Sequence, residues 1–384
     1  EYARELIEMG EAYTCDLPAE EFSALKREGE PSPNRDKDRE TVMEEFEAMI
    51  DGEYASGELV LRIKTDMDHK NPALRDWVAF RMIDTPHPRE AAEDYRCWPM
   101  LDFQSGIDDH LTGLTHIIRG IDLQDSAKRQ EFVYDYFDWE YPEVLHWGHV
   151  QIDAYDIDIS TSTIKELIDA GELDGWDDPR APTLQSIRRR GVRAEAVVES
   201  MIGLGMSTTD VDLAMSSIYA NNRDIVDSEA NRYFLVRDGQ QLPVVDDEKL
   251  AAGTPPLHPN HEERVTRQIP VDDAVLVEPA DLPEEGERIW LKGYGCVRYE
   301  DEAFVATSDD IDAVREEGVD VIHGVPADET VSVNMRTPDG DVTGEAEPAV
   351  AETEVDEVIQ FERIGFVRVD DHAGDESVVY YTHD

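Results

Sequence analysis

The alternation of apolar and polar residues changes character along the chain. Up to about residue 95, short helical patterns alternate with strand-like runs. The residues up to Gly10 and those from Pro18 to Gly29 have the apolar spacing of helices, and each glycine marks a helix end. A third helix is predicted over Thr41–Ile50, and residues 57–67 alternate as a strand does. This first region is therefore predicted to mix helices and strands.

The central stretch, residues 98–123, begins with a short apolar run and continues with apolar residues spaced as on one helix face, at Ile107, Leu111 and Leu114. A second run, Thr115–Ile118, is predicted to be a buried strand, and Arg119 follows it directly. Open α/β sheets bind ligands at the carboxyl ends of their strands, and a guanidinium fork suits a carboxylate or a phosphate. Arg119 is therefore a candidate ligand-binding residue.

Beyond this stretch, amphipathic helical patterns continue to about residue 235 and then give way to short alternating runs. Gly, Pro and Asp separate these runs, as in β-rich domains. The predicted strands cover residues 265–272, 274–282, 287–300, 331–340, 357–371 and 377–384. This part is predicted to be all-β, and 384 residues suffice for roughly two to four domains.

The net charge of −54, from 89 acidic and 35 basic residues, allows three interpretations. A disordered acidic chain is disfavoured, because the apolar periodicity is clear and the chain has 6 tryptophans. An acidic mimic of nucleic acid is usually a small protein. We favour a folded protein from a very salty cytoplasm, where the Debye length falls to about 3 Å and acidic surfaces no longer repel RNA at long range.

The three cysteines, Cys15, Cys97 and Cys296, lie too far apart for a disulfide framework or a zinc site. They suit a reducing cytoplasm, and we expect no structural zinc and no metal-ligating site residues. No apolar run is long enough to span a membrane, and no signal peptide is visible. The sequence starts at Glu1 inside an amphipathic pattern, so we expect a piece whose beginning has been removed.

Four further segments carry the strongest signal: NPALRDWVAFR at 71–81, ISTS at 159–162, GWDDPRAPTLQSIRRRG at 175–191 and QFERIGFVRVD at 360–370. With the central stretch, they resemble in their order the class I glutamyl- and glutaminyl-tRNA synthetases. The archaeal and eukaryotic type of glutamyl enzyme is the best match. The resemblance covers nearly the whole chain, and its GWDDPR-to-RRRG block is highly specific.

The resemblance implies a multidomain fold with α/β and all-β parts. It implies first an insertion that receives the tRNA acceptor end, then the second half of a Rossmann-type catalytic domain with a KMSKS-like loop. A helical connecting domain and anticodon-binding β-barrels are expected to follow. The corresponding residues are 1–95, 96–170, 171–240 and 241–384.

Enzymes of this family read the amino acid with the central stretch, and the resemblance places Leu101, Asp102, Asp109 and Arg119 at that site. Glutaminyl enzymes have a tyrosine in place of Leu101 and a small neutral residue in place of Arg119. An arginine there resembles the glutamyl enzymes, because a cation pairs with a carboxylate but loses hydration against a neutral amide. The alternatives are that Arg119 only pairs with Asp102, Asp109 or Asp122, and that the first two aspartates cap helices.

HWGH at residues 146–149 looks like the HIGH signature of class I synthetases, but we interpret it as a decoy. The true signature belongs at the first strand–helix turn, far ahead of the second ATP motif, and no glycine-rich phosphate turn precedes HWGH. We expect the true motif upstream of these residues. A contact between His149 and adenine is the role left for this segment.

ISTSTIK at residues 159–165 takes the place of the KMSKS-type loop, whose lysine stabilises the triphosphate in the transition state. Thr161 stands at the aligned lysine place, which puts the usual mechanism of this loop in doubt. Ser160, Thr161 and Ser162 are the candidate phosphate donors, and Lys165 is the nearby lysine. The alternative is that Ser160 or Thr161 caps the following helix.

The predicted tRNA contacts are arginines: Arg75 and Arg81 for the 3′ end, Arg188 and Arg190 for the inner corner, and Arg298 and Arg363 for the anticodon part. For Arg75 and Arg81, and for Arg298 and Arg363, a structural ion pair within the protein is an equally good explanation. Adjacent helical positions point in different directions, so the arginines at 188–190 are not expected to form one patch. One of them is predicted to tie the loop through Asp177 or Asp178, with Thr183 as the helix cap.

The activity implied by the resemblance is the ATP-dependent conversion of L-glutamate, with Mg²⁺, to glutamyl-adenylate and its transfer to the 3′ end of tRNA(Glu). We expect a cytoplasmic monomer. In strong salt counterion release contributes little, so RNA recognition has to rest on local arginines, hydrogen bonds and stacking. Charging of tRNA(Gln), a glutaminyl enzyme and a catalytically inactive tRNA-binding relative are the alternatives. HPNH at residues 258–261 is interpreted as structural rather than metal-binding.

Overall fold

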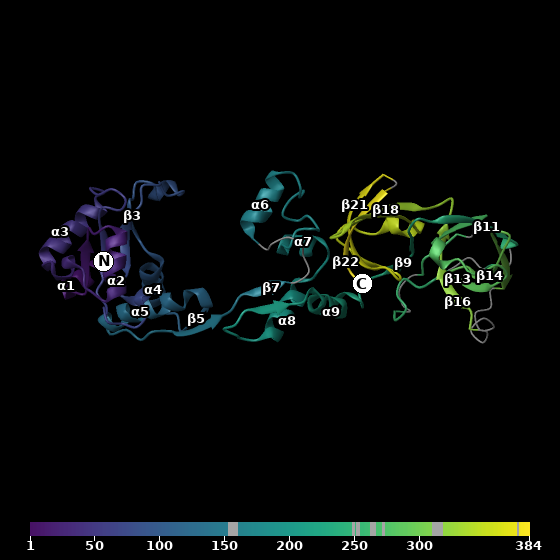
Figure 1. Ribbon diagram of the computed structural model, residues 1–384. Coiled ribbons are helices and arrows are strands. Elements are labelled where there is room, and N and C mark those ends of the chain that lie inside the picture. The colour runs from purple at the N-terminus through teal and green to yellow at the C-terminus, as the bar shows by residue number, and fades with distance from the viewer. Residues whose placement is uncertain are drawn as a thin grey trace. The chain divides into compact units, whose positions relative to one another are not determined.

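The computed structural model describes residues 1–152, 160–247, 250, 254–261, 266–270, 273–308, 318–374 and 376–384. These residues form two compact units (Figure 1). The first comprises Glu1–Val150 and Met206–Val211, and the second comprises Gln151–Gly205 and Asp212–Asp384. A short segment in the middle of the second unit thus belongs to the first.

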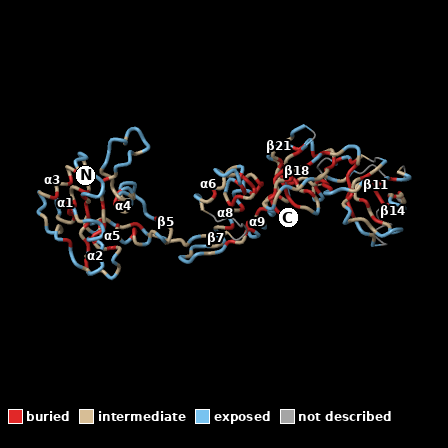
Figure 2. Tube along the Cα trace, turned by 45° about the horizontal axis from the view of Figure 1, so that its top comes forward, coloured by how far each residue is buried: buried red, intermediate tan, exposed pale blue. Residues whose placement is uncertain are grey.

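The first unit is built on an antiparallel sheet with strand order β1-β2-β3-β4. Its strands and the accompanying helices are α1 (Tyr2–Met9), β1 (Ala12–Cys15), α2 (Ala19–Glu28), α3 (Arg39–Ile50), β2 (Val60–Ile63), β3 (Val78–Met82) and β4 (Cys97–Pro99). As predicted, α1 and α2 end at Gly10 and Gly29, whose φ angles of 88° and 80° suit glycine best. Leu6, Phe46 and Leu61 lie in the shared buried core. Figure 2 shows buried positions, in red, around α1, α2 and α3.

The central stretch folds as α4 (Leu101–Leu111), β5 (His116–Gly120), α5 (Gln124–Phe137) and β6 (Glu143–Trp147). The two strands pair in parallel and form a two-stranded sheet. The two helices pack together, and the Tyr134 hydroxyl on α5 donates a hydrogen bond to the Gly106 carbonyl on α4 at 2.8 Å. This arrangement places Arg119 on β5, next to both helices.

The predicted burial of this stretch is wrong in part. Ile107 is buried, but Leu111 and Leu114, predicted on the same helix face, are exposed. Thr115–Ile118 is not a buried strand within the described residues, because Ile118 is 65% exposed. The reason is that β5 has one neighbouring strand and no described element covers its outer face. Parallel sheets are normally covered on both faces, so the apolar surface here is unpartnered.

The second unit begins with a helical part. Its helices are α6 (Thr161–Asp169), α7 (Leu184–Arg189), α8 (Ala194–Leu204) and α9 (Met215–Val226), and a two-stranded sheet joins β7 (Val150–Ile152) to β8 (Val211–Leu213). The helices predicted from the amphipathic pattern after residue 190 are confirmed as α8 and α9. These two pack together, and the Asn221 amide donates a hydrogen bond to the Ser200 hydroxyl at 2.8 Å.

The rest of the second unit is β structure, as predicted. One sheet has the strand order β10-β19-β18-β22-β21-β20-β9 and the other β16-β13-β14-β15-β11-β12-β17. Only Phe234 separates the edge strands β9 and β10, and only Gly324 separates the edge strands β16 and β17. Each sheet therefore curls until its edges nearly meet, like a barrel. Of the predicted strand at 265–272, the described part forms an isolated bridge between Thr266 and Pro256.

The strands of these two sheets are β9 (Arg232–Tyr233), β10 (Leu235–Val236), β11 (Gln240–Val245), β12 (Ala274–Val277), β13 (Arg288–Lys292), β14 (Gly295–Glu300), β15 (Ala303–Ser308), β16 (Asp320–His323), β17 (Val325–Pro326), β18 (Val331–Thr337), β19 (Gly340–Ala346), β20 (Val358–Phe361), β21 (Gly365–Ala373) and β22 (Glu376–His383). Short 3-10 helices occupy several connections of the chain: η1 (Pro33–Asp36), η2 (Pro72–Leu74), η3 (Glu90–Ala92), η4 (Ile121–Leu123), η6 (Pro279–Asp281) and η7 (Pro348–Glu352).

A buried ion pair joins the two sheets. The Arg267 guanidinium contacts both carboxylate oxygens of Glu347, at 2.8 and 2.9 Å, and both side chains are almost fully buried. The same carboxylate accepts the backbone N–H of Phe234 at 2.7 Å. Phe234 lies in the core of the sheet that contains β13, whereas its neighbours in sequence are edge strands of the other sheet. The pair thus fixes the residue at which the two sheets meet.

Candidate functional site

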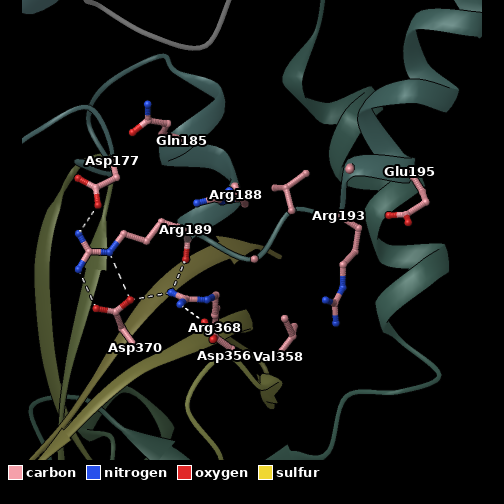
Figure 3. A pocket seen from close by; sticks show the side chains of 13 residues that line it. Asp177, Gln185, Arg188, Arg189, Arg193, Glu195, Asp356, Val358, Arg368 and Asp370 are labelled. Atoms are coloured by element: carbon pink, nitrogen blue, oxygen red, sulfur yellow. Dashed lines mark hydrogen bonds and ion pairs between the residues drawn. The ribbon is translucent and has the colours of Figure 1, made fainter.

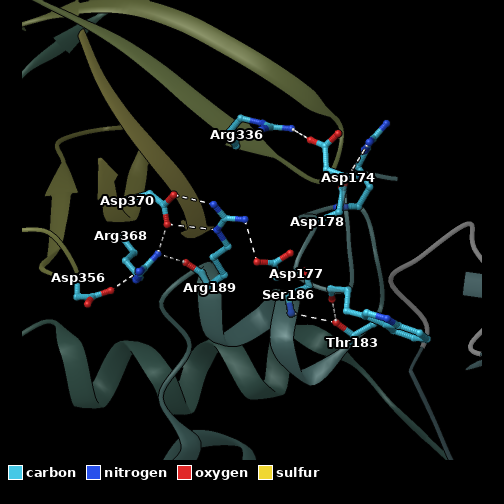
Figure 4. A network of polar contacts seen from close by, with 12 residues as sticks. Asp174, Asp177, Asp178, Thr183, Ser186, Arg189, Arg336, Asp356, Arg368 and Asp370 are labelled. Atoms are coloured by element: carbon cyan, nitrogen blue, oxygen red, sulfur yellow. Dashed lines mark hydrogen bonds and ion pairs between the residues drawn. The ribbon is translucent and has the colours of Figure 1, made fainter. Parts of the chain in front are cut away.

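The loop before α7 is organised by the buried carboxylate of Asp178. It accepts hydrogen bonds from the backbone N–H groups of Asp174 and Arg180, each at 2.9 Å, and from the Arg180 guanidinium at 2.6 and 2.9 Å. Burial alone raises the pKa of this carboxyl, but the hydrogen bonds outweigh burial and lower the pKa to about 2. Thr183 caps α7 as predicted, accepting the Ser186 N–H at 3.0 Å (Figure 4).

This carboxylate is expected to make the second unit sensitive to acid. Its pKa is depressed in the folded state, so its contribution is present above about pH 4 and is lost as the pH falls through about 2. We expect the loss to reach about 2 kcal/mol, since the shift from 3.8 to about 2 is nearly two pKa units. Urea unfolding of the parent and of Asp178→Asn across this range measures it. Asp178→Asn should reduce the change of the unfolding free energy with pH, whereas the exposed control Asp169→Asn should not. The same pH dependence in all three proteins would contradict the role assigned to Asp178.

The three consecutive arginines at the end of α7 leave the helix in different directions, as their spacing predicts. Arg188 is exposed. Arg189 pairs with Asp177 at 2.9 Å, the predicted tie, and with Asp370 on β21 at 2.8 Å (Figure 4). Arg190 is 1% exposed, and its guanidinium reaches the last strand, β22. The Arg188 guanidinium is therefore accessible to solvent, that of Arg189 holds the loop before α7, and that of Arg190 is buried.

A cavity of about 800 Å³ opens beside these arginines (Figure 3). Its charged lining residues are Arg188, Arg189, Arg193, Arg368, Asp177, Glu195, Asp356 and Asp370. Arg368 pairs with Asp356 and Asp370, and Arg193 lies 3.6 Å from Glu229. Arg188 has no ion pair among the described residues. The cavity wall therefore offers Arg188 as its uncompensated cation.

The candidate substrate residues in the first unit separate into two pairs. Arg119 contacts Asp109 at 2.9 Å, which is one of the pairings considered from the sequence, and it also donates to the Gln130 side-chain oxygen at 2.6 Å. Asp102 pairs instead with Arg129 on α5 at 2.6 Å. No motif or spacing in the sequence pointed to Arg129 or Gln130. Leu101 begins α4 and is 57% exposed.

The candidate ATP residues at 160–165 lie at the start of α6. Ser160 is the N-cap residue, but its side chain makes no capping hydrogen bond, and Thr161, Ser162 and Lys165 are exposed. The first N–H groups of α6 therefore receive no side-chain cap from Ser160, and anions bind helices at such N-termini. Ile159 and the six residues before it lie outside the described residues.

HWGH lies at a strand end rather than at a strand–helix turn. His146 is on β6, and Gly148 donates its N–H to the Ser207 carbonyl at 2.7 Å. His149 is exposed, and its ring lies 3.4 Å from Asp210. No helix follows before β7 begins at Val150. This geometry supports the interpretation of HWGH as a decoy, and a contact of His149 with adenine stays a prediction.

The other arginines predicted to contact tRNA differ in their hydrogen bonds and ion pairs within the protein. Arg75 donates to the backbone carbonyls of His69, at 2.8 Å, and Lys26, at 2.5 Å. Arg81 on β3 is exposed. The two arginines in the β part have carboxylate partners: Glu300 lies 3.3 Å from Arg298, and Asp281 lies 2.5 Å from Arg363.

No group of three or more His, Cys, Asp or Glu side chains in the described ranges has the geometry of a metal site. His258 of the HPNH segment is buried, and its Nε2 contacts the Asp227 carbonyl at 2.7 Å, which is a structural role. Within the same ranges, no helix combines the length and the apolar character needed to cross a membrane.

Family models match almost the whole chain. The model described as tRNA synthetases class I (E and Q), catalytic domain, matches residues 1–228. Two models described as the anti-codon binding domain of the same enzymes match residues 230–315 and 321–370. The chain therefore belongs to the class I tRNA synthetases for glutamate and glutamine.

Within this family the similar proteins are glutamate–tRNA ligases of haloarchaea. The chain is 66% identical over 383 residues to that of Natronomonas pharaonis, covering 100% of this chain and 67% of that protein. It is 64% identical over 396 residues to that of Halobacterium salinarum, covering 100% of this chain and 68% of that protein. The chain thus spans about two thirds of the length of these relatives.

Similarity extends to a methanogen and, weakly, to a solved structure. The glutamate–tRNA ligase of Methanosarcina barkeri is 44% identical over 389 residues, covering 100% of this chain and 67% of that protein. A crystal structure of a glutamate tRNA ligase from Elizabethkingia meningosepticum is 19% identical and covers 43% of this chain and 35% of that chain, with a TM-score of 0.28. A score this low supports no inference.

Proposed function

We propose that this chain carries the tRNA-binding part and a portion of the active site of a glutamate–tRNA ligase that works in a salt-rich cytoplasm. The observation that carries the proposal is the 66% identity to a glutamate–tRNA ligase across the whole chain. The fixed cation at Arg119 supports glutamate rather than glutamine, because a guanidinium held by Asp109 and Gln130 is ready to meet a carboxylate.

The proposed reaction has two steps. The α-carboxylate of glutamate attacks the α-phosphate of ATP, giving glutamyl-adenylate and pyrophosphate, and a terminal ribose hydroxyl of tRNA(Glu) then takes the acyl group. Catalysis rests on positioning and charge stabilisation. Arg119 and Leu101 are proposed to meet the glutamate side chain, with Asp102 and Asp109 fixing cations around it. Mg²⁺ would accompany ATP and would supply charge neutralisation at its phosphates; among the described residues, no group of three or more His, Cys, Asp or Glu side chains could hold a separate metal ion.

The phosphates of ATP are proposed to meet the start of α6. The hydroxyls of Ser160, Thr161 and Ser162 and the first N–H groups of the helix are available there, because Ser160 makes no capping hydrogen bond. Lys165 is one turn further along the same helix. His149 is the proposed adenine contact.

tRNA is proposed to lie along both units. Residues 1–95 receive the acceptor end, residues 96–170 complete the active site, residues 171–240 meet the inner corner, and residues 241–384 hold the anticodon part. Arg81 and Arg188 are the exposed cations that support direct contact. Arg75 and Arg190 are bound to backbone carbonyls, so they support binding by fixing the loops that carry exposed neighbours. To contact tRNA, Arg298 and Arg363 would have to leave the carboxylates of Glu300 and Asp281 and pair with RNA phosphates instead.

The charging reaction tests the proposal directly. A hybrid that joins this chain to the remaining third of the Natronomonas pharaonis enzyme is incubated with ATP, tRNA and either labelled glutamate or labelled glutamine in concentrated KCl. We expect charging with glutamate and none with glutamine, and we expect Arg119→Met to lower kcat/KM for glutamate by about 100-fold. Charging with glutamine, or no charging by a folded hybrid that binds tRNA, would refute the proposed activity.

Arg188 provides a prediction for tRNA binding by this chain itself. Arg188→Ala should weaken tRNA binding roughly tenfold, since a charge-assisted contact to phosphate contributes about 1.5 kcal/mol. Filter binding at several KCl concentrations measures this effect and should also show a smaller salt dependence. Arg188→Lys keeps the charge but not the fork and should lie between the two. Unchanged affinity in Arg188→Ala would exclude a contact at this residue.

A further inference from the structure

A second cavity lies within the first unit. Residues of α2, β2 and α5 line it, together with residues at the starts of β3 and α4. Its volume is about 350 Å³. Its lining residues are Ala19, Phe22, Ser23, Lys26, Arg62, Trp77, Val78, Met100, Leu101, Asp102 and Arg129. Leu101 and Asp102, both predicted to bind the amino acid, therefore line this cavity, and Gln130, which contacts Arg119, donates to the Asp102 carbonyl at 3.1 Å.

The charges around this cavity do not balance. Three cations line it, Lys26, Arg62 and Arg129, against a single carboxylate, Asp102. Arg129 already occupies that carboxylate at 2.6 Å. Lys26 has no ion pair among the described residues, and its ammonium group makes one long contact, 3.5 Å to the Ala73 carbonyl. In a chain with a net charge of −54, such an excess of positive charge around one cavity, with Arg62 buried and Lys26 and Arg129 half-buried, is unexpected.

The positions of the cations are fixed by the fold. Arg62 is 7% exposed, stacks on the ring of Phe22 at 3.3 Å, and donates to the Asp76 carbonyl at 3.0 Å. Arg129 donates to the Ala73 carbonyl at 2.9 Å as well as to Asp102. Neither guanidinium can leave the site without breaking these contacts. The cavity is therefore lined by two guanidinium groups whose positions the fold fixes, and not by flexible lysines on the surface.

Lys26 responds to this excess of positive charge. Burial is the largest cause that lowers the pKa of its ammonium group to about 8, followed by the positive charges of Arg129 and Arg62. The Asp76 carboxylate raises this pKa and Arg75 lowers it, both by less. The charged form of Lys26 is thus destabilised mainly by burial, and among the described residues it has no carboxylate as an ion-pair partner. An anion placed beside the three cations would supply that partner and restore the pKa.

We propose that this cavity binds a phosphate group, contacted by Lys26 and Arg129, with Arg62 as the fixed cation behind them and Asp102 as the residue that positions Arg129. A phosphate fits because it has several acceptor oxygens and can accept from an ammonium and a guanidinium together. The exposed Leu101 at the rim offers an apolar contact to an attached sugar or base. Resting on the proposed function, the phosphate belongs either to the acceptor end of tRNA or to a free nucleotide.

Proton uptake distinguishes this site from a general attraction between RNA and arginines. At about pH 8 half of the Lys26 side chains are neutral, so filling the site should take up about half a proton. Above about pH 8 the affinity should fall by up to tenfold per pH unit. Arginines stay charged throughout this range and produce no such dependence.

The test is titration calorimetry of the whole chain at about pH 8, in concentrated KCl and in two buffers with different ionisation enthalpies. The probes are a tRNA acceptor minihelix ending in CCA, the same minihelix without its last three nucleotides, ATP, and inorganic phosphate. Uptake with the CCA minihelix alone assigns the site to the RNA 3′ end, and uptake with ATP or phosphate assigns it to a free phosphate. Uptake with none of the probes overturns the proposal.

Two substitutions and a control separate the site from the rest of the RNA surface. Lys26→Met should abolish proton uptake and weaken binding of the active probe about tenfold. Lys26→Arg should keep binding but lose the uptake, since arginine does not titrate here. The control Lys128→Met removes an exposed lysine on α5 and should change neither. If the minihelix binds but Lys26→Met changes nothing, this inference fails while the proposed function stands; if no RNA binds at all, the proposed function fails.

Discussion

Replacing Arg190 by alanine is expected to lower the free energy of unfolding of the second unit by about 3–5 kcal/mol. The Arg190 guanidinium donates to the carbonyls of Tyr381 and Thr382, each at 2.7 Å, and to the Tyr219 hydroxyl at 2.9 Å. Alanine would leave these buried acceptors unsatisfied and open a cavity. Since the contacts join α7 to β22 and α9, the last strand should lose its protection first.

Hydrogen exchange of peptides from β22, together with urea unfolding, measures this effect. Arg190→Lys should restore little, because one ammonium cannot reach three acceptors arranged around a planar fork. Arg188→Ala is the matched control two residues away, and its exposed side chain should leave stability within about 0.5 kcal/mol. The two variants therefore test opposite properties, stability for Arg190 and tRNA affinity for Arg188. A stable Arg190→Ala with unchanged exchange in β22 would contradict the buried role.

Replacing Glu347 by alanine is expected to destabilise the two-sheet part by about 3–5 kcal/mol. The substitution leaves the Arg267 guanidinium without its carboxylate; among the described residues its Nη2 already has no hydrogen-bond partner, and it lies 4.0 Å from Glu362. It also removes the acceptor of the Phe234 N–H, at the residue where the two sheets meet. An uncompensated buried charge is the main cost, because the protein interior solvates it poorly.

The double variant Arg267→Met, Glu347→Leu is the informative comparison. It removes the charge together with its partner, so we expect it to be less destabilised than Glu347→Ala alone, and Arg267→Met alone to be destabilised as well. Urea unfolding followed by near-ultraviolet circular dichroism compares the four proteins. A double variant as unstable as the sum of the two single variants would mean that the pair does not act as a unit.

Local signals were sufficient for much of the fold. Gly10 and Gly29 end α1 and α2 because glycine reaches positive φ at low cost, and this preference is visible in the sequence. Alternation of apolar residues marked β13, β18, β20, β21 and β22, since side chains on a strand alternate between two faces. Thr183 as the cap of α7 and Asp177 as the tie of one arginine were also predictable from spacing along a single turn.

Long-range contacts were not predictable in this way. Asp102 pairs with Arg129, 27 positions later, and Arg267 pairs with Glu347, 80 positions later. Periodicity identifies the face of an element that is buried, but it does not identify the partner. For the same reason the burial of Ile118 was predicted wrongly, because an apolar residue on a strand is buried only if another element covers that face.

The sequence by itself determined the family, the order of the helical and β regions, and the residues that carry charge in an otherwise acidic chain, since each of these depends on residue identity and short spacing. Only the tertiary structure decided which arginine is exposed, which one ties a loop and which one is buried among Arg188, Arg189 and Arg190. It also decided that Lys26, Arg62 and Arg129 share one cavity. The physical reason is that a side chain's electrostatic role depends on what lies within a few ångströms of it, and folding brings those neighbours from distant parts of the chain.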